Sequence, residues 1–573
     1  MRRPGVLALL PPRTALPEQT RAIRFFESRI LALAAMFAAL GLKPNVVIAA
    51  ATDNVRTVAL SGMPAPGTSE GFGDVGYSGV SLNNHGETAF IASPTFNNYE
   101  FVFEPRPTAP VNDESVWTEA GGGGLRRIAR EGPGMPGDGT FEHVARPLIS
   151  DRGATLYHAS YFGDGQATPY YPRNLFRNQL GQAEMAVMTR GTPAPSTDVF
   201  FQSIGAPSVN ANGKTAFRGL LGNTEAFAAD GIWAEQGGGA LDLVARRGSN
   251  APGIWGTFRD LSEKPAIGLA GHVAFLSTLI DNDLDNANNE AIWIASPTGE
   301  LKTVARGRDA APGVDDRLRL LGEPSVNRYG DLAFSSGLFS SLHSGNQRGN
   351  AIVRYNAEEG LAAVALEGER PPGVDAVFSS NRFNSPPFFG ATIGDGGHIT
   401  FSASLLENNE VTGSIWVAGP TGVLELVARE GDPAPGTTDS FSALGGPTVN
   451  ARGQVAFSGR TVDFTNGHYG IWAQDQRGDL RLVARAGDRL DVSDDPAAPD
   501  LRTIAYLSFR HAGSFGGEEV TGFNDRGQVA FFARFTDGAS GVFVSNVVAV
   551  PEPSAVVLTL GLLVMGTALH RTR

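Results

Sequence analysis

The sequence predicts an all-β protein, consisting of a single eight-bladed β-propeller with four antiparallel strands in each blade. Three observations lead to this prediction. A short turn-and-strand unit recurs eight times, two further strand-like segments follow each copy, and the strands balance only if the two ends of the repeat region pair with each other. No interior stretch has sustained helical periodicity, so the sequence excludes a helical solenoid.

The recurring unit is clearest at Val449–Phe457, which reads Val-Asn-Ala-Arg-Gly-Gln-Val-Ala-Phe. The other seven copies are Asn83–Phe90, Ser150–Tyr157, Asn210–Phe217, Gly268–Phe275, Asn327–Phe334, Gly394–Phe401 and Asn524–Phe531. The final aromatic residues of successive copies, all eight included, are 56 to 74 positions apart. Self-similarity at this spacing is the sequence signature of a repeat architecture.

Each unit contains four predicted strands, as the seventh copy illustrates. These strands are Phe441–Asn450, Gln454–Gly459, Gly470–Ala473 and Leu480–Arg485. The turns between them are rich in asparagine, aspartate and glycine, which tolerate the positive φ that short hairpin connections need. A loop rich in glycine and proline follows the fourth strand. Four short antiparallel strands repeated around an axis describe a propeller, which exposes only short edges.

Every blade has four strands only if the single strands at the two ends of the repeat region belong to the same blade. Arg56–Leu60 reads as a fourth strand without the first three, and Gly541–Val544 reads as a third strand without a fourth. We expect the two to pair, which completes the last blade and removes two exposed sheet edges. The sequence thus predicts eight blades within residues 52–549. Seven blades and a separate hairpin are the alternative, because Phe96–Ser115 and Leu490–Gly517 read as insertions into the first and last blades.

Composition excludes several classes of function. The chain has no cysteine, which rules out disulfide bonds, thiolate chemistry and cysteine-ligated metals. Its net charge is −13; residues 1–51 contribute +5 and residues 554–573 contribute +2, so the residues between carry −20. An acidic body repels phosphate backbones, and we therefore expect no nucleic-acid partner.

Residues 1–51 have the layout of a secretory signal peptide. A basic lead is followed by the apolar run Ile30–Leu42 and then by the small residues Ala49–Ala51. The basic residues of the lead are Arg2, Arg3, Arg13, Arg21, Arg24 and Arg29. The alternative is a helix that stays in the membrane as an anchor.

The C-terminus carries three elements in a fixed order. They are the box Pro551-Glu552-Pro553, the largely apolar stretch Ala555–Leu569, and a tail containing Arg571 and Arg573. A helix over the apolar stretch would be about 22 Å long, short against a hydrocarbon core of about 30 Å. Residues 550–573 resemble the PEP-CTERM sorting signal of exported proteins from Gram-negative bacteria that produce exopolysaccharide.

That resemblance implies processing by an exosortase, a membrane cysteine protease, after transient anchoring through the C-terminal transmembrane helix. It also implies delivery to the cell surface or the extracellular matrix. The alternative, an ordinary tail anchor, places the protein on the same side of the membrane. The repeat region is similar to the tandem NxxGxxAF repeats of PEP-CTERM bacteria, and more distantly to TolB-type and other WD40-like propellers. Some copies depart from the pattern: Ser150 and Gly268 replace the asparagine, and Leu175-Phe176 replaces Ile-Trp. We expect the blades that contain them to be less regular but still closed.

No catalytic residue is predicted. Gly67–Gly71 matches the nucleophile-elbow pattern Gly-x-Ser-x-Gly, but it lies in a loop where a hydrolase needs a strand before it and a helix after it. The nine histidines form no metal-binding motif. Asp281, Asp283 and Asp285 alternate as the ligands of a calcium loop do, without the required glycine and glutamate. A solvated loop is the favoured interpretation and calcium the alternative; no other cofactor is expected.

Two recurring side chains are candidate ligand contacts. Arginines close the fourth strands at Arg130, Arg190, Arg246, Arg306, Arg429 and Arg485. Tryptophans stand in the third strands at Trp117, Trp233, Trp293, Trp416 and Trp472. If the first strand lines the axis, the arginines lie at the rim, where pairing with acidic neighbours is favoured over polysaccharide binding. Packing between blades is favoured for the tryptophans.

The sequence therefore favours an exported binding or structural protein of the cell surface or matrix, with an extracellular polysaccharide or surface protein as the partner. Its loops differ from blade to blade over a repeated scaffold, as ligand-specific surfaces do. The enzymatic alternative is a glycan-active hydrolase or lyase. It requires carboxylates, or a histidine and a carboxylate, to converge near the axis.

Overall fold

The computed structural model describes residues 55–549 with thirteen short gaps. The gaps are residues 77–78, 95–113, 133–140, 162–173, 183–184, 224–225, 237–239, 281–288, 341–346, 380–386, 462–467, 496 and 512–519. The signal region, the sorting signal from Pro551 to Arg573 and the calcium candidates Asp281, Asp283 and Asp285 lie outside the described residues. All secondary-structure elements of the described residues are β-strands. None of the described segments forms a helix able to span a bilayer.

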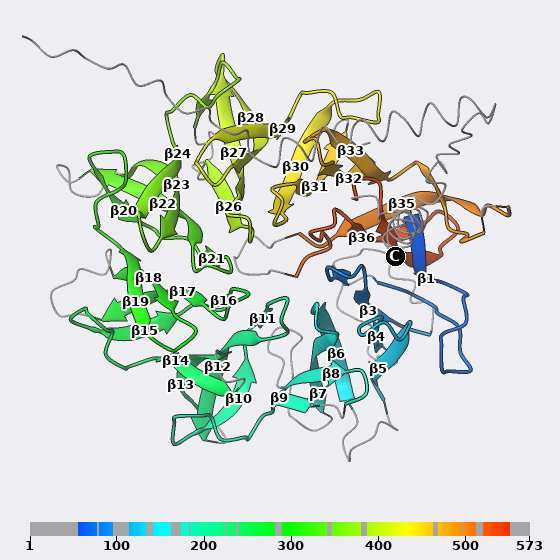
Figure 1. Cartoon of the computed structure of the whole chain (residues 1–573), viewed down its shortest axis with the longest axis horizontal. Coiled ribbons are helices and arrows are strands. Elements are labelled where there is room, and N and C mark those ends of the chain that lie inside the picture. The colour runs from blue at the N-terminus through cyan, green and yellow to red at the C-terminus, as the bar shows by residue number, and fades with distance from the viewer. Residues whose placement is uncertain are drawn as a thin grey trace, which may run out of the picture. The chain divides into compact units, whose positions relative to one another are not determined.

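Eight antiparallel sheets follow one another around a common centre, as predicted (Figure 1). Blade 1 consists of β2 (Ser81–Leu82), β3 (Thr88–Ala92), β4 (Ser115–Thr118) and β5 (Arg126–Arg130). Blade 2 consists of β6 (Phe141–Ile149), β7 (Ala154–Tyr161), β8 (Asn174–Gln179) and β9 (Met185–Met188). Blade 7, which contains the clearest copy of the repeat, consists of β30 (Phe441–Val449), β31 (Val455–Thr461), β32 (His468–Gln474) and β33 (Leu480–Arg485).

In blades 3 to 6 the innermost strand is split into two short pieces that pair with the same second strand. Blade 3 has β10 (Phe200–Ile204), β11 (Ser208–Val209), β12 (Thr215–Asn223), β13 (Ala226–Glu235) and β14 (Leu241–Arg246). Blade 4 has β15 (Thr257–Leu261), β16 (Ala266–Ile267), β17 (Val273–Ile280), β18 (Glu290–Ala295) and β19 (Leu301–Arg306). Blade 5 has β20 (Asp316–Arg319), β21 (Ser325–Val326), β22 (Leu332–Ser340), β23 (Gln347–Asn356) and β24 (Gly360–Leu366). Blade 6 has β25 (Val377–Phe378), β26 (Phe388–Ile393), β27 (Ile399–Glu407), β28 (Glu410–Ala418) and β29 (Leu424–Arg429).

Blade 8 is closed by the N-terminal strand. It contains β34 (Arg489–Asp491), β35 (Leu501–Phe509), β36 (Val529–Phe535), β37 (Ser540–Ser545) and β1 (Val55–Leu60). β1 runs antiparallel to β37, with Val55 opposite Ser545 and Leu60 opposite Gly541, and a bulge at Val58. This pairing confirms the predicted closure of the ring. The described residues form eight blades, so the seven-blade alternative is wrong.

One part of the prediction is wrong. Leu490–Gly517 reads as an insertion, but it contains β35, which is the first strand of blade 8 and pairs with β36. A bulge between Ile504 and Tyr506 interrupts the alternation of its apolar residues, which hides the strand in the sequence. Residues 512–519, which fall in one of the gaps, also separate this strand from its turn.

The core lies between neighbouring blades. The aromatic residue that ends each repeat is buried, and the third-strand tryptophans of blades 3, 4, 6 and 7 are completely buried beside it. In blade 7, Trp472 packs edge-on against Phe441 at 4.9 Å and belongs to a cluster that includes Ile415 of blade 6. The same arrangement recurs for Trp233 and Trp293. Side chains on both faces of each sheet are thus removed from water, which is the main stabilising term for the ring.

Candidate functional site at the axial turns

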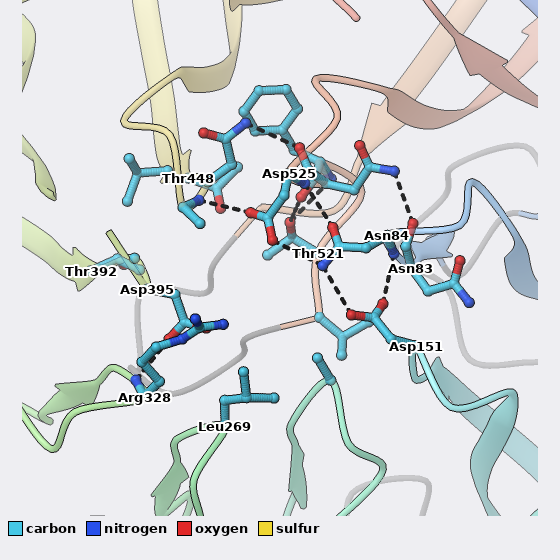
Figure 2. A pocket seen from close by; sticks show the side chains of 18 of the residues that line it. Asn83, Asn84, Asp151, Leu269, Arg328, Thr392, Asp395, Thr448, Thr521 and Asp525 are labelled. Atoms are coloured by element: carbon cyan, nitrogen blue, oxygen red, sulfur yellow. Dashed lines mark hydrogen bonds and ion pairs between the residues drawn. The ribbon is translucent and has the colours of Figure 1, made fainter. Parts of the chain in front are cut away.

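A small cavity lies where the turns between the first and second strands of all eight blades converge (Figure 2). We call these the axial turns and number their residues from position 1, the asparagine of the repeat, so that the glycine is position 4. The cavity has a volume of about 130 Å³. Its polar lining comes mainly from positions 1 and 2, which include Asn83, Asn84, Asp151, Arg328 and Asp525.

The asparagine at position 1 shapes each turn. In blade 7 the Oδ1 atom of Asn450 accepts hydrogen bonds from the backbone N–H groups of Arg452 and Gln454, at 3.0 and 3.1 Å. Gly453 at position 4 has a φ of +84°, a conformation that favours glycine. Asn83, Asn327 and Asn524 accept equivalent pairs of bonds. The side chain thus satisfies two backbone donors that a turn leaves without partners.

Four position 1 asparagines also link their own blade to the next one. The Nδ2 group of Asn83 donates to the Ser150 carbonyl, that of Asn210 to Gly268, that of Asn450 to Asn524, and that of Asn524 to Asn83, at 2.8 to 3.1 Å. Every recipient is position 1 of the following blade. The last bond runs from blade 8 to blade 1 and therefore joins the two ends of the ring.

Three aspartates at position 2 add a second set of links. Asp151 accepts from the backbone N–H and the side-chain amide of Asn84, at 2.7 and 3.0 Å. Asp525 accepts from the N–H of Ala451 at 2.8 Å and from the Asn84 amide at 2.9 Å.

Asp395 accepts from the N–H and the Nε of Arg328, at 2.7 and 3.1 Å. In all three aspartates both carboxylate oxygens are therefore engaged in joining blades, as Figure 2 shows for the labelled side chains.

Two turns depart from the repeat for a steric reason. A Cβ atom on Gly268 would lie 2.4 Å from the carbonyl oxygen of Asn327, and one on Gly394 would lie 2.9 Å from that of Asn450. Both approaches are closer than a carbon and an oxygen tolerate. The glycines therefore allow close contact with the next blade, and the turns keep regular geometry where the sequence pattern predicts irregular blades.

Histidine occupies position 5 in these same two turns. The ring of His272 lies against Gly330 of blade 5, and that of His398 lies against Gly453 of blade 7. Burial lowers the pKa of both imidazoles below the usual histidine value. A hydrogen bond to the Arg328 backbone opposes the shift for His272. The Nδ1 atoms have no hydrogen-bond partner among the described residues.

Outside the axial turns, one carboxyl group has a strongly shifted pKa. Glu323 lies between β20 and β21 and accepts a hydrogen bond of 2.6 Å from Ser262 of blade 4. Burial raises the pKa of Glu323 to about 7; the Ser262 bond opposes this, and the charge of Glu263 adds to it. His158 shows the opposite case, since complete burial and then the charges of Arg146 and Arg510 lower its pKa to about 3.

The Glu323 shift predicts a pH-dependent stability. A carboxyl with a pKa of about 7 in the folded chain and 4.5 as its ordinary value contributes stability that is fully present below 4.5 and is lost as pH rises through 7. We expect the free energy of unfolding to fall by about 1–3 kcal/mol between pH 5 and pH 8 relative to a Glu323→Gln variant. Urea unfolding at both pH values measures this. Replacing the exposed Glu410 with Gln should leave the difference unchanged, and a pH response identical in wild type and Glu323→Gln would contradict the assignment.

The structure tests the other candidate side chains from the sequence. The rim arginines Arg130, Arg246, Arg429 and Arg485 form ion pairs with Glu70, Asp198, Glu407 and Asp439, respectively. The five third-strand tryptophans are at most 3% exposed. Gly67–Gly71 lies in a hydrogen-bonded loop closed by a bridge between Pro64 and Gly71. These findings confirm the structural interpretations of the four arginines, the tryptophans and Gly67–Gly71, and none of these side chains belongs to the axial cavity.

Sequence reasoning missed the axial site because it treated position 1 only as a turn former. The signal was available in the repeat itself, since an asparagine kept at a buried position has a side chain that needs partners. Asn83, Asn210, Asn327, Asn450 and Asn524 are all at most 4% exposed. The described residues contain no group of three or more potential metal ligands.

The closed ring of eight four-stranded units defines the chain as an eight-bladed β-propeller. Residues 82–557 match the protein family described as "Family of unknown function (DUF7453)", and the chain belongs to that family. Among curated proteins, none matches the chain in sequence.

Solved structures with a similar fold are distant in sequence. Prolyl oligopeptidase B from Galerina marginata is 9% identical, with a TM-score of 0.37 over 81% of this chain and 56% of that protein. Pyrococcus horikoshii acylaminoacyl peptidase is 10% identical, with a TM-score of 0.35 over 72% and 52%. A polysaccharide lyase acting on ulvan is 13% identical, with a TM-score of 0.30 over 70% and 94%. The chain thus spans about half the length of the two peptidases, and at these scores the similarities carry no functional argument.

Proposed function

We propose that the chain is an exported binding protein whose axial turns form a face for extracellular glycans, and that it has no catalytic role. The observation that carries this proposal is the state of the axial aspartates. Asp151, Asp395 and Asp525 hold neighbouring blades together through both carboxylate oxygens. A general acid or base needs a carboxyl that can exchange a proton with a substrate.

The size of the cavity supports the same conclusion. Its volume of about 130 Å³ is below the ~300 Å³ at which pockets for small molecules begin. A sugar ring could not be enclosed there with catalytic groups around it. A polymer lying across the mouth of the cavity would instead contact the exposed side chains of the turns.

Export is proposed from the two ends of the sequence. The basic, apolar and small-residue order of residues 1–51 supports a cleaved signal peptide. Pro551-Glu552-Pro553, the apolar stretch and the terminal arginines support transient anchoring and exosortase processing at the surface of a Gram-negative cell.

One observation favours the alternative, a hydrolase or lyase. Glu323 and Glu263 interact electrostatically, and the raised pKa of Glu323 would keep part of it protonated at neutral pH. A carboxyl that stays partly protonated, next to a second carboxyl, is the usual arrangement in glycoside hydrolysis. However, Glu263 is also paired with Arg218, and the two carboxyls lie outside the axial cavity.

A single comparison separates the two proposals. Residues 52–549 are applied to a glycan array, and the same sample is incubated with each bound glycan while reducing ends and unsaturated products are measured. We expect binding without product formation. Product formation that is abolished by Glu323→Gln would establish the enzymatic alternative, and absence of binding to every glycan would refute the binding proposal.

A further inference from the structure

The exposed layer of the axial turns is basic and aromatic although the body of the chain is acidic. In five of the eight turns position 3 carries a basic or aromatic residue, His85, Arg152, Tyr329, Arg452 or Arg526, and Arg328 stands at position 2 of blade 5. His85, Arg152, Arg328, Tyr329 and Arg452 are exposed. The residues between the basic ends of the chain carry a net charge of −20. Exposed cationic side chains therefore occur in the turns that form the cavity, against the overall charge; of the residues named here, Arg328 lines the cavity itself.

The three aspartates at position 2 of these turns are less accessible than the exposed side chains at position 3. Asp151, Asp395 and Asp525 are only partly exposed and accept hydrogen bonds from the adjoining turns. In the pair formed by Arg328 and Asp395, the arginine side chain is 44% exposed and the aspartate 20%. The guanidinium group of this pair is thus more accessible to a ligand than the carboxylate.

Two of these arginines are available for a ligand. Among the described residues, the guanidinium groups of Arg152 and Arg452 form neither an ion pair nor a hydrogen bond. Their backbones are held by turns whose position 1 side chains are buried, Ser150 in blade 2 and Asn450 in blade 7. Placing charged groups on a rigid support lowers the entropy lost when a ligand binds.

An aromatic surface accompanies the charges. Tyr329 is 67% exposed. The guanidinium carbon of Arg328 lies 6.0 Å from the centroid of the Tyr329 ring. An exposed ring next to a cation can stack on the apolar face of a sugar while the cation binds an acidic substituent.

We propose that the axial turns bind a carboxylate-bearing polysaccharide, with Arg152 and Arg452 as carboxylate contacts and Tyr329 as the stacking platform. This inference rests on the proposed glycan-binding function and specifies its ligand. Arginine recognises carboxylates through two parallel hydrogen bonds, which lysine cannot form. A polyuronate carries one charge per sugar and so meets less repulsion from the acidic body than a nucleic acid, whose charges are about 1.7 Å apart along the axis.

The test compares two double variants of the exported chain that change charge equally. In the first, Arg152→Gln is combined with Arg452→Gln. In the second, which is the control, Arg477→Gln is combined with Arg489→Gln; both residues are exposed and lie outside the axial turns. Binding to polygalacturonate, to neutral dextran and to a DNA duplex is measured for each chain at low and high salt, after equal thermal unfolding midpoints have been verified.

We expect the axial double variant to bind polygalacturonate at least about tenfold more weakly than wild type, and the control variant to bind as wild type does. An equal loss in both double variants would show general charge attraction and overturn the inference. Binding of dextran alone, or tighter binding of DNA, would also overturn it while leaving a binding function in place. Binding of no glycan on the array or in solution would refute the proposed function itself.

Discussion

A chain that begins at residue 61 should be far less stable than one that begins at residue 52, although both lack the signal region. The shorter chain loses β1, whose Val58, Ala59 and Leu60 are at most 8% exposed. Burial of valine and leucine alone stabilises by roughly 1.5–3 kcal/mol each. Removing the strand also exposes the edge of β37, so we expect a loss on the order of 5 kcal/mol or more.

Other contacts of β1 explain why the effect should extend beyond blade 8. Arg56 pairs with Glu119 of blade 1 at 2.6 Å and donates to the Gly86 carbonyl in the axial turn of that blade. Within blade 8, Thr57 also donates through its hydroxyl to the Val492 carbonyl at 2.9 Å. Guanidinium unfolding of both chains, followed by tryptophan fluorescence, measures the difference. Coincident unfolding curves would mean that the pairing of β1 with β37 contributes nothing to the ring.

Restoring the repeat at Gly268 should destabilise the protein, contrary to what the sequence pattern alone suggests. Asparagine is the residue of the repeat at this position, and replacing a departing residue with the common one usually stabilises a repeat. Here a Cβ would lie 2.4 Å from the Asn327 carbonyl oxygen. Relieving that contact requires the turns of blades 4 and 5 to move apart, and we expect Gly268→Asn to cost about 2–4 kcal/mol.

The matched control introduces the same side chain two residues away. Ala270 is exposed in the same axial turn, and Ala270→Asn should change the free energy of unfolding by no more than about 0.5 kcal/mol. Urea titrations of the two variants provide the comparison. A Gly268→Asn protein as stable as wild type would show that the glycine has no steric role.

The arrangement of blades could be predicted because it depends on local patterns and on counting. The order of turn, strand and aromatic residue is repeated within each unit, and the single strands at the two ends of the repeat region are visible as remainders. β33 matches its predicted bounds, Leu480–Arg485. β35 could not be predicted in this way, because a bulge breaks its alternation and its turn does not follow at the usual distance.

The axial site was less accessible from sequence because its contacts join residues far apart in the chain. Asn450 donates to a carbonyl 74 residues away, and Asn524 donates to one 441 residues away. The local sequence pattern does not predict which backbone carbonyl the buried side-chain amide of a position 1 asparagine will contact. The roles of Asp151 and Asp525 become visible only when the neighbouring blades are in place.

The position 1 amide bonds of blades 1, 3, 7 and 8 all run in one rotational sense, from a blade to its successor, and the bond from blade 8 returns to the first donor, Asn83. A chain organised in this way has no terminal unit, so it does not need the specialised end caps that open repeat arrays require. Because blades 8 and 1 are joined to close the ring, gaining or losing a single unit would alter the angle between every pair of neighbours. The number of units is therefore a property of the assembled circle, and duplication of one repeat cannot lengthen this protein by degrees.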